Sequence, residues 1–283
     1  MLFFIGLIVV FGCVLGSFSV HGSLKVLWQP LEFVIIVGAA VGAMIITNPG
    51  GTLKDSLKSL KFLLKGKPYK KSDYMQLLQF LFEVFKLVKT KGLLQIESHI
   101  ENSHESEIFK KYPTILHDHH VVDFFCDNMR LLTLGVDNQY VMSDAMDQEL
   151  EIHHHEGLMA AGALGTFGES LPALGIVAAV LGVIVTMGSI SEPPEILGGL
   201  IGAALVGTFA GILLSYGVFS PIGAFVGHYV NAQSAFFICI KLAIVSHLQG
   251  NAPTITVEIV RKSIPIHERP TFSEVDKAIN SSS

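Results

Sequence analysis

FGESLPALGIVAAVLG at residues 167–182 and LVGTFAGILLSYGVFSPIG at residues 205–223 are the two most informative stretches of this sequence. Each places a proline, Pro172 or Pro221, within or beside a long uncharged run. A proline inside a helix removes one backbone hydrogen bond and clashes with the preceding turn, so a membrane helix that keeps one contains a hinge or a polar gap. The two stretches therefore predict membrane helices that can bend or let something through.

Around these stretches, charge is distributed very unevenly along the 283 residues. Apolar residues make up 50% of the chain, charged residues make up 15%, and the mean hydropathy is +0.54. Four runs carry no Lys, Arg, Asp or Glu: residues 1–24, 33–53, 170–191 and 196–240. Because a membrane-spanning helix needs roughly 20 apolar residues, these runs predict four transmembrane helices. We expect them at residues 1–22, 32–52, 169–191 and 196–222.

The fourth run is too long for one span and continues past Pro221 into HYVNAQSAFFICIKLAIVSHLQG at residues 228–250. The strongly apolar part of this segment is short, and Lys241 interrupts it. A stretch of that length favours an amphipathic helix packed under the membrane, with a fifth span as the alternative. Residues 223–283 are thus expected to form a cytoplasmic C-terminal helix and tail.

Residues 53–157, between the second and third runs, predict a helical cytoplasmic domain. In DYMQLLQFLFEVFKLVKTKGLLQIE, residues 73–97, apolar side chains recur every three or four positions, which predicts a buried helix face that ends near Gly92. VVDFFCDNMRLLTLG, residues 121–135, repeats this character. Strand signals are weak. The expected fold class is all-α: a polytopic membrane protein with four transmembrane helices and a helical cytoplasmic domain.

The basic residues predict the topology. Of the 19 Lys and Arg residues, 13 lie between Lys54 and Arg130, five lie from Lys241 onward, and Lys25 stands alone. Cytoplasmic loops carry the excess of basic residues, so the middle domain and both termini are expected in the cytoplasm. The first span lacks a basic leader and a persuasive cleavage site, which favours a retained helix. Three cysteines in apolar contexts indicate no disulfide framework.

The sequence gives little support for an enzyme. It contains no GxxxxGK[ST], HExxH, CxxC or GxSxG motif, and no cofactor or nucleic-acid partner is expected. Two histidine clusters, HDHH at residues 117–120 and HHHE at residues 153–156, are the best metal candidates. Consecutive residues on a helix point in different directions, so both clusters are interpreted as solvated surface. Glu169 lies at the edge of the third run. A carboxylate there can stabilise a helix N-terminus, and an ionisable residue inside a span would be a functional candidate, although the boundary position weakens that interpretation. The spans contain no obvious ion-carrying carboxylate.

Small residues recur at a spacing of four within the spans. The pairs are Gly38 with Gly42, Gly198 with Gly202, and Gly207 with Gly211. This spacing lets helix backbones approach closely in lipid. The pairs therefore predict helix neighbours inside the membrane, within this chain or in other subunits.

Taken together, these features resemble the MotA family of flagellar motor stator subunits. The resemblance rests on four spans with a large loop between the second and third, and on four phrases in the family's order. They are LQIESHIENSHESEIFKKYP at residues 94–113, PALGIVAAVLG at 172–182, VGTFAGILLSYGVFSPI at 206–222 and ERPTF at 268–272. It covers nearly the whole chain.

The resemblance implies an assembly and a set of site residues. The family forms a homo-oligomeric ring, expected to be a pentamer, in the inner membrane lipid around a MotB dimer whose single span carries the proton-accepting aspartate. Pro172 and Pro221 match the prolines that flank that pathway. Lys89 and Glu97 match the charges that contact the rotor protein FliG, with lysine here where relatives have arginine. That replacement keeps the charge but loses the planar bidentate fork.

The resemblance also bears on the driving ion. Sodium-driven relatives have threonine at the position of Ala179, and a hydroxyl there helps to replace water around the ion. Alanine offers no ligand, which favours protons, while Thr208 keeps the other hydroxyl of the pathway. Two alternatives remain: a ring subunit of the ExbB and TolQ type, and an ion channel formed by this chain alone.

Overall fold

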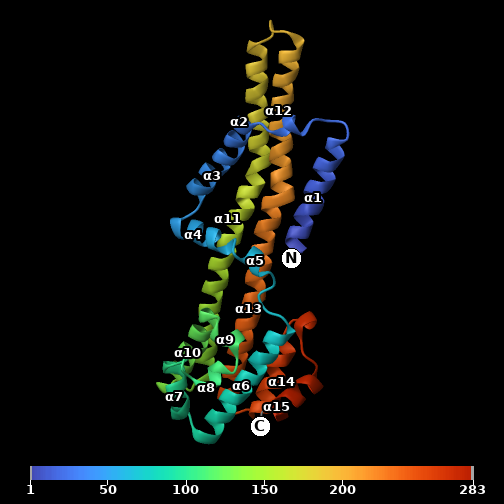
Figure 1. The fold of residues 1–283 in the computed structure, drawn as a ribbon. Coiled ribbons are helices and arrows are strands. Elements are labelled where there is room, and N and C mark those ends of the chain that lie inside the picture. The colour runs from blue at the N-terminus through green and yellow to red at the C-terminus, as the bar shows by residue number, and fades with distance from the viewer. Residues whose placement is uncertain (1, 282–283) are drawn as a thin grey trace. The chain divides into compact units, whose positions relative to one another are not determined.

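A computed structural model describes residues 2–281; most of these residues are helical, and there is no strand among them. The all-α prediction is confirmed (Figure 1). The chain divides into two compact units. Unit 1 comprises Met1–Gly66 and Glu156–Tyr229, and unit 2 comprises Lys67–His155 and Val230–Ser283. Two long helices, α11 (Gln139–Gly188) and α13 (Ser220–Leu248), contribute residues to both units.

Unit 1 contains the apolar runs. Its remaining elements are α1 (Leu2–Ser19), the 3₁₀ turn η1 (Leu24–Leu27), α2 (Pro30–Phe33), the π-helical turn η2 (Val34–Gly38), α3 (Ala39–Thr47), α4 (Gly50–Ser59), α5 (Phe62–Lys65), α12 (Pro194–Leu214) and the π-helical turn η3 (Ser215–Phe219). Its small core is built from Ile36, Ala40, Phe167, Leu171, Ala178 and Ala210. Most other apolar side chains of unit 1 face outward, as expected of helices that contact lipid or other membrane helices.

Four helical segments are long and apolar enough to cross a membrane: Leu2–Ser19, Leu24–Thr47, Gln139–Gly188 and Pro194–Leu248. The predicted number of four spans is therefore confirmed. Within residues 2–281, the structure contains no separate fifth helix that is long and apolar enough to span a membrane. Residues 220–248 form one helix, α13, because no glycine turn or further proline interrupts the chain between Pro221 and Leu248.

Unit 2 is a helical domain with its own core. Its remaining elements are α6 (Lys71–Lys91), α7 (Leu94–Glu101), α8 (Glu107–Lys110), α9 (Pro113–Leu116), α10 (His119–Thr133), α14 (Pro253–Ser263), the 3₁₀ turn η4 (Ile266–Glu268) and α15 (Phe272–Ser281). The predicted apolar face of α6 is buried, and α6 ends where Gly92 adopts a φ of 86°, a conformation that glycine adopts without strain. Phe80 packs edge-on against Phe109 and Phe125 at 4.9 Å from each ring.

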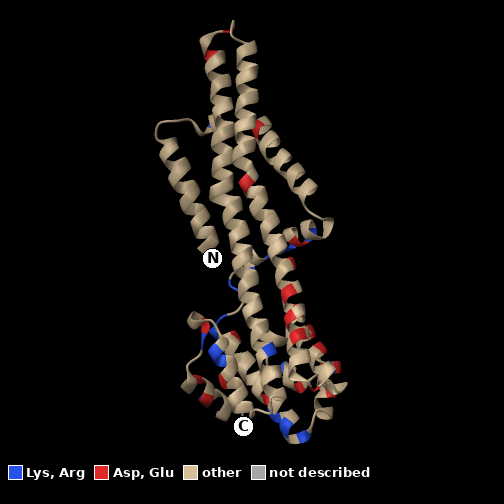
Figure 2. Ribbon diagram, turned by 180° about the vertical axis from the view of Figure 1, so that it is seen from behind, with Lys and Arg blue, Asp and Glu red and all other residues tan. Residues whose placement is uncertain are grey.

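Charged residues follow this division. Lys, Arg, Asp and Glu are frequent in unit 2 and sparse on α1, α3 and α12 (Figure 2). The three cysteines are free: Cys13 is exposed, and Cys126 and Cys239 are buried. This agrees with the prediction that the chain has no disulfide framework.

Candidate functional site

Within unit 1, α11 and α12 lie side by side and approach each other through glycines (Figure 1). A Cβ atom added at Gly211 would lie 2.6 Å from the carbonyl oxygen of Leu171. One added at Gly175 would lie 2.8 Å from the carbonyl oxygen of Gly207. Both separations are too short for a carbon atom, so any side chain at these positions would force the helices apart. Glycine is what permits this contact.

The three predicted glycine pairs differ in outcome. Gly207 and Gly211 face α11 closely, as predicted for a helix interface. A Cβ atom added at Gly38, Gly42 or Gly198 would meet no atom of the described residues within 4 Å, and one added at Gly202 would meet only a methyl group of Val26 at 3.8 Å. Of the three glycine pairs spaced by four residues, Gly207 with Gly211 is therefore the one that makes a close helix contact among the described residues.

Ala179 and Thr208 lie at the same α11–α12 contact. A Cβ atom at Gly207 would be 3.4 Å from the backbone nitrogen of Ala179, and one at Gly175 would be 3.4 Å from the Cα atom of Thr208. Both residues are half-buried. The structure therefore brings together two residues, far apart in the chain, that the family resemblance matches to the ion pathway.

Glu32 is an ionisable residue that the sequence analysis did not single out. It lies in α2, inside the second candidate span Leu24–Thr47. Its Oε2 atom is buried, has no hydrogen-bond partner among the described residues, and would lie 3.1 Å from a Cβ atom at Gly207. An ionisable group inside a span is a functional candidate. The carboxylate therefore adjoins the contact where Ala179 and Thr208 lie.

The two prolines disturb their helices in different ways. Pro172 lies within α11, which continues through it. Pro221 is the second residue of α13 and follows η3, a π-helical turn in which the backbone amide of Ser220 donates to the carbonyl oxygen of Ser215. A proline cannot donate the hydrogen bond of a regular helix, and a widened turn accommodates it. Pro172 is half-buried and Pro221 is exposed.

The structure also places Glu169 and the two histidine clusters. Glu169 is exposed in the middle of α11, so it cannot stabilise a helix N-terminus there. The histidine clusters take part in contacts within unit 2: Asp118 caps α10 and accepts a hydrogen bond from the hydroxyl of the buried Tyr69 at 2.6 Å, and His154 Nδ1 lies 2.8 Å from Ser234 Oγ. Within residues 2–281, no three His, Cys, Asp or Glu side chains are placed to hold a metal ion.

Lys89 and Glu97 lie in unit 2, near the end of α6 and in the first turn of α7. Both are exposed, and neither forms a salt bridge with another described residue. The two helices pack against each other. Both charges are therefore available to a partner surface.

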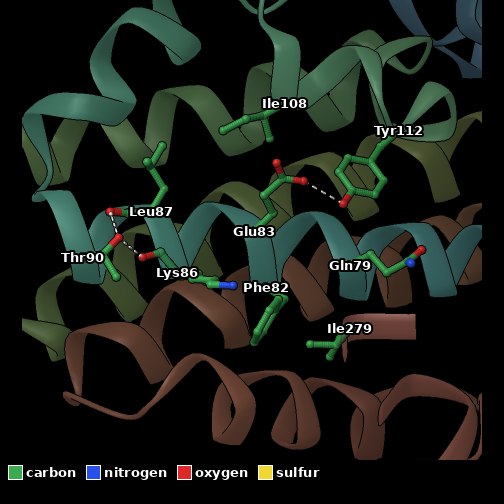
Figure 3. Close-up of a pocket in the computed structure, with 9 residues that line it drawn as sticks. All are labelled: Gln79, Phe82, Glu83, Lys86, Leu87, Thr90, Ile108, Tyr112 and Ile279. Atoms are coloured by element: carbon green, nitrogen blue, oxygen red, sulfur yellow. Dashed lines mark hydrogen bonds between the residues drawn. The ribbon is translucent and has the colours of Figure 1, made fainter. Parts of the chain in front are cut away.

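A shallow pocket lies on another face of α6 (Figure 3). Glu83 occupies it, accepting a hydrogen bond from the Tyr112 hydroxyl at 3.0 Å and forming an ion pair with Lys111. Burial, together with the Glu83 carboxylate, raises the pKa of Tyr112. The lining residues are Gln79, Phe82, Glu83, Lys86, Leu87, Thr90, Ile108, Tyr112 and Ile279. The Glu83 charge is already satisfied within unit 2, which distinguishes it from Lys89 and Glu97.

Comparison with known proteins identifies the family of this chain. Residues 4–92 match the motility protein A N-terminal family, and residues 117–237 match the MotA/TolQ/ExbB proton channel family. The chain is 42% identical to Motility protein A of Escherichia coli over 280 residues, which cover 99% of this chain and 95% of that protein. The chain belongs to the motility protein A family.

Other relatives agree with this assignment to the motility protein A family. Chemotaxis protein LafT of Vibrio parahaemolyticus is 33% identical over 275 residues, covering 97% of this chain and 96% of LafT. The fold is similar to C. jejuni MotAB, with a TM-score of 0.79 and 21% identity over 95% of this chain and 98% of that one. It is also similar to the flagellar MotAB stator complex from Bacillus subtilis, with a TM-score of 0.75 and 21% identity over 97% and 98%.

Proposed function

We propose that this chain is a flagellar motor stator subunit that, with a MotB-type partner, couples proton flow across the bacterial inner membrane to torque on the rotor. The observation that carries the proposal is the 42% identity to Motility protein A over 99% of the chain. The match of its fold to structures named MotAB supports it. The family matched by residues 117–237 includes ExbB and TolQ in its name, whereas residues 4–92 match a family named for motility protein A alone, which supports a MotA-type subunit over the ExbB and TolQ alternative.

The proposed topology places four spans near residues 1–22, 32–52, 169–191 and 196–222. The domain at residues 53–157 and the tail at residues 223–283 then lie in the cytoplasm with both termini. The basic residues support this arrangement, since 18 of the 19 Lys and Arg residues lie between Lys54 and Lys277. We infer a pentameric ring around two copies of the MotB-type partner.

The first step of the proposed mechanism is protonation of the partner's aspartate. Neutralising that carboxylate changes its contacts with the wall formed near Pro172, Thr208 and Pro221. Ala179 offers no hydroxyl to replace water around a metal cation, which supports protons as the driving ion. One charge crossing 100 mV yields about 2.3 kcal/mol, enough to shift a packing arrangement that has two states of similar free energy.

In the second step the ring moves and the cytoplasmic domain pushes the rotor. Exposed charges such as Lys89 and Glu97 suit this role, because exposed ion pairs are worth at most about 1 kcal/mol and release quickly. We propose FliG as the rotor partner on the strength of the family resemblance. A weak contact that forms and breaks repeatedly is what stepping requires.

An ion channel formed by this chain alone is the second candidate, and the buried Glu32 carboxylate favours it. Two measurements separate the candidates. In a strain that lacks its own stator, this chain with its MotB-type partner should restore rotation, and this chain alone should not. In liposomes, the chain without a partner should not conduct protons; conduction by the chain alone would contradict the stator proposal and favour the channel.

A further inference from the structure

Buried polar atoms without partners are concentrated in unit 1. Among the described residues, four buried side-chain oxygen or nitrogen atoms lack a hydrogen-bond partner: Glu32 Oε2, Gln139 Oε1, Ser215 Oγ and Ser220 Oγ. Three of these four lie in unit 1, where the surrounding helices are apolar. Buried polar groups in native proteins are almost always paired with protein or ordered water. The unpaired atoms therefore require a physical explanation.

The two serines lie on η3 and at its end, facing α11. A Cβ atom at Gly168 of α11 would lie 3.0 Å from Ser220 Oγ. Ser215 is fully buried and follows Gly211 by one helical turn, and Gly211 contacts Leu171 of α11. Phe167 and Phe219 close this region with rings 4.7 Å apart. Both hydroxyls thus lie in the same inter-helix region, enclosed by apolar side chains.

Pro172 adds an acceptor to the same region. In a regular helix the amide at position 172 would donate to the carbonyl of Gly168, the residue of α11 that lies beside Ser220. Proline has no amide hydrogen, so this bond cannot form. The region therefore combines two hydroxyls with a carbonyl oxygen that has lost its usual donor. Water, which donates two hydrogen bonds and accepts two, suits such a set.

We propose that Ser215 and Ser220 bind ordered water between η3 and α11, and that this water satisfies the carbonyl oxygen of Gly168, which Pro172 leaves without its usual donor. The site is a hydrated hinge inside the membrane unit. In the hinge, water exchanges hydrogen bonds among several acceptors, so the helices bend without leaving a carbonyl unpaired in lipid. The role of the hinge in motion rests on the proposed function, whereas the water site itself does not.

The experiment compares S215A and S220A with the unmodified chain, each purified as the full-length complex with the MotB-type partner. The control is S170A, because the Ser170 hydroxyl already donates to its own helix, to the Phe167 carbonyl at 2.8 Å. The first readout is the midpoint of thermal unfolding. The second is the rotation speed of tethered cells at matched expression.

The sign of the thermal shift decides the proposal. Removing a hydroxyl that binds water leaves other buried groups unsatisfied and destabilises the protein, whereas removing an unpaired hydroxyl stabilises it. We expect S215A and S220A to lower the midpoint by several degrees and to slow rotation, with S170A changing both much less. An unchanged or raised midpoint in S215A and S220A, or an equal loss in S170A, would overturn the water site. Failure of the unmodified complex to rotate would contradict the proposed function and leave the thermal comparison valid.

Discussion

The carboxylate of Glu32 lies next to Gly207, where a side chain would crowd it: a Cβ atom added at position 207 would lie 3.1 Å from Oε2 of Glu32, 3.2 Å from the Cβ atom of Ala178 and 3.4 Å from the backbone nitrogen of Ala179. A glycine on α12 thus makes room for a carboxylate from α2 beside α11. This contact joins three of the four candidate spans at the position of the proposed ion pathway.

Replacing Glu32 should impair coupling. We expect E32Q to reduce rotation speed while leaving the amount of membrane-inserted protein unchanged, because glutamine keeps the size of the side chain and removes its charge. The measurement is tethered-cell rotation at matched expression. E195Q is the control, since Glu195 is exposed in the first turn of α12. Equal rotation speeds for E32Q and E195Q would remove Glu32 from the pathway.

The close approach of α11 and α12 predicts a strong difference between two glycines of the same helix. G211A places a carbon 2.6 Å from the Leu171 carbonyl oxygen, whereas G198A meets no atom within 4 Å among the described residues. Forcing an extra methyl group into a close contact costs about 1–3 kcal/mol, so G211A should lower the thermal unfolding midpoint. G198A should leave it unchanged or raise it, since alanine favours helix. If G211A were as stable as G198A, the glycine contact would be wrong.

The rotor-contact hypothesis predicts loss of function without loss of stability. K89E and E97K reverse exposed charges that form no salt bridge with a described residue, so stability should change by no more than about 0.5 kcal/mol. Rotation should fall sharply in both. K110E, at an exposed lysine of α8, serves as the control. Normal rotation in K89E and E97K would mean that other residues contact the rotor.

The core of unit 2 can be probed through Cys126. Burial raises the pKa of its thiol from an ordinary value of 9.0 to about 12, so the thiol is protonated and shielded at neutral pH. In a variant that keeps only this cysteine, a maleimide should react slowly with the folded protein and fast after denaturation. Because the folded state holds the proton more tightly, this group's stabilising effect is constant below pH 9 and declines as pH rises toward 12. Rapid labelling of the native protein would contradict this burial.

The sequence predicted features that depend on local patterns. The apolar spacing of residues 73–91 and the stop at Gly92 correspond to α6, because helix periodicity and glycine termination are encoded within a few residues. The number of spans followed from charge-free runs in the same way. The partner of Lys241 could not be predicted in this way, because its ion pair with Asp147 is a contact between residues far apart in the sequence.

The burial of Glu32 and of the unpaired serines could not be predicted from the sequence, because it too depends on contacts between distant residues. Glu32 stands just outside a charge-free run, and its burial depends on Gly207, which lies on a different span. Ser215 and Ser220 look like ordinary small polar residues of a membrane helix. Only the packing of η3 against α11 shows that their hydroxyls are enclosed. One signal was available in the sequence: Glu32 closely follows Pro30 at the start of an apolar run.

The central claim is that protons moving past this subunit and its MotB-type partner drive rotation. The most direct test is tethered-cell rotation in a strain without its own stator, complemented with this chain and its partner, while the proton and sodium gradients are collapsed separately. We predict that rotation stops when the proton gradient collapses and continues when only the sodium gradient is removed, since Ala179 supplies no hydroxyl for a metal cation. Rotation that depends on sodium instead would contradict the account.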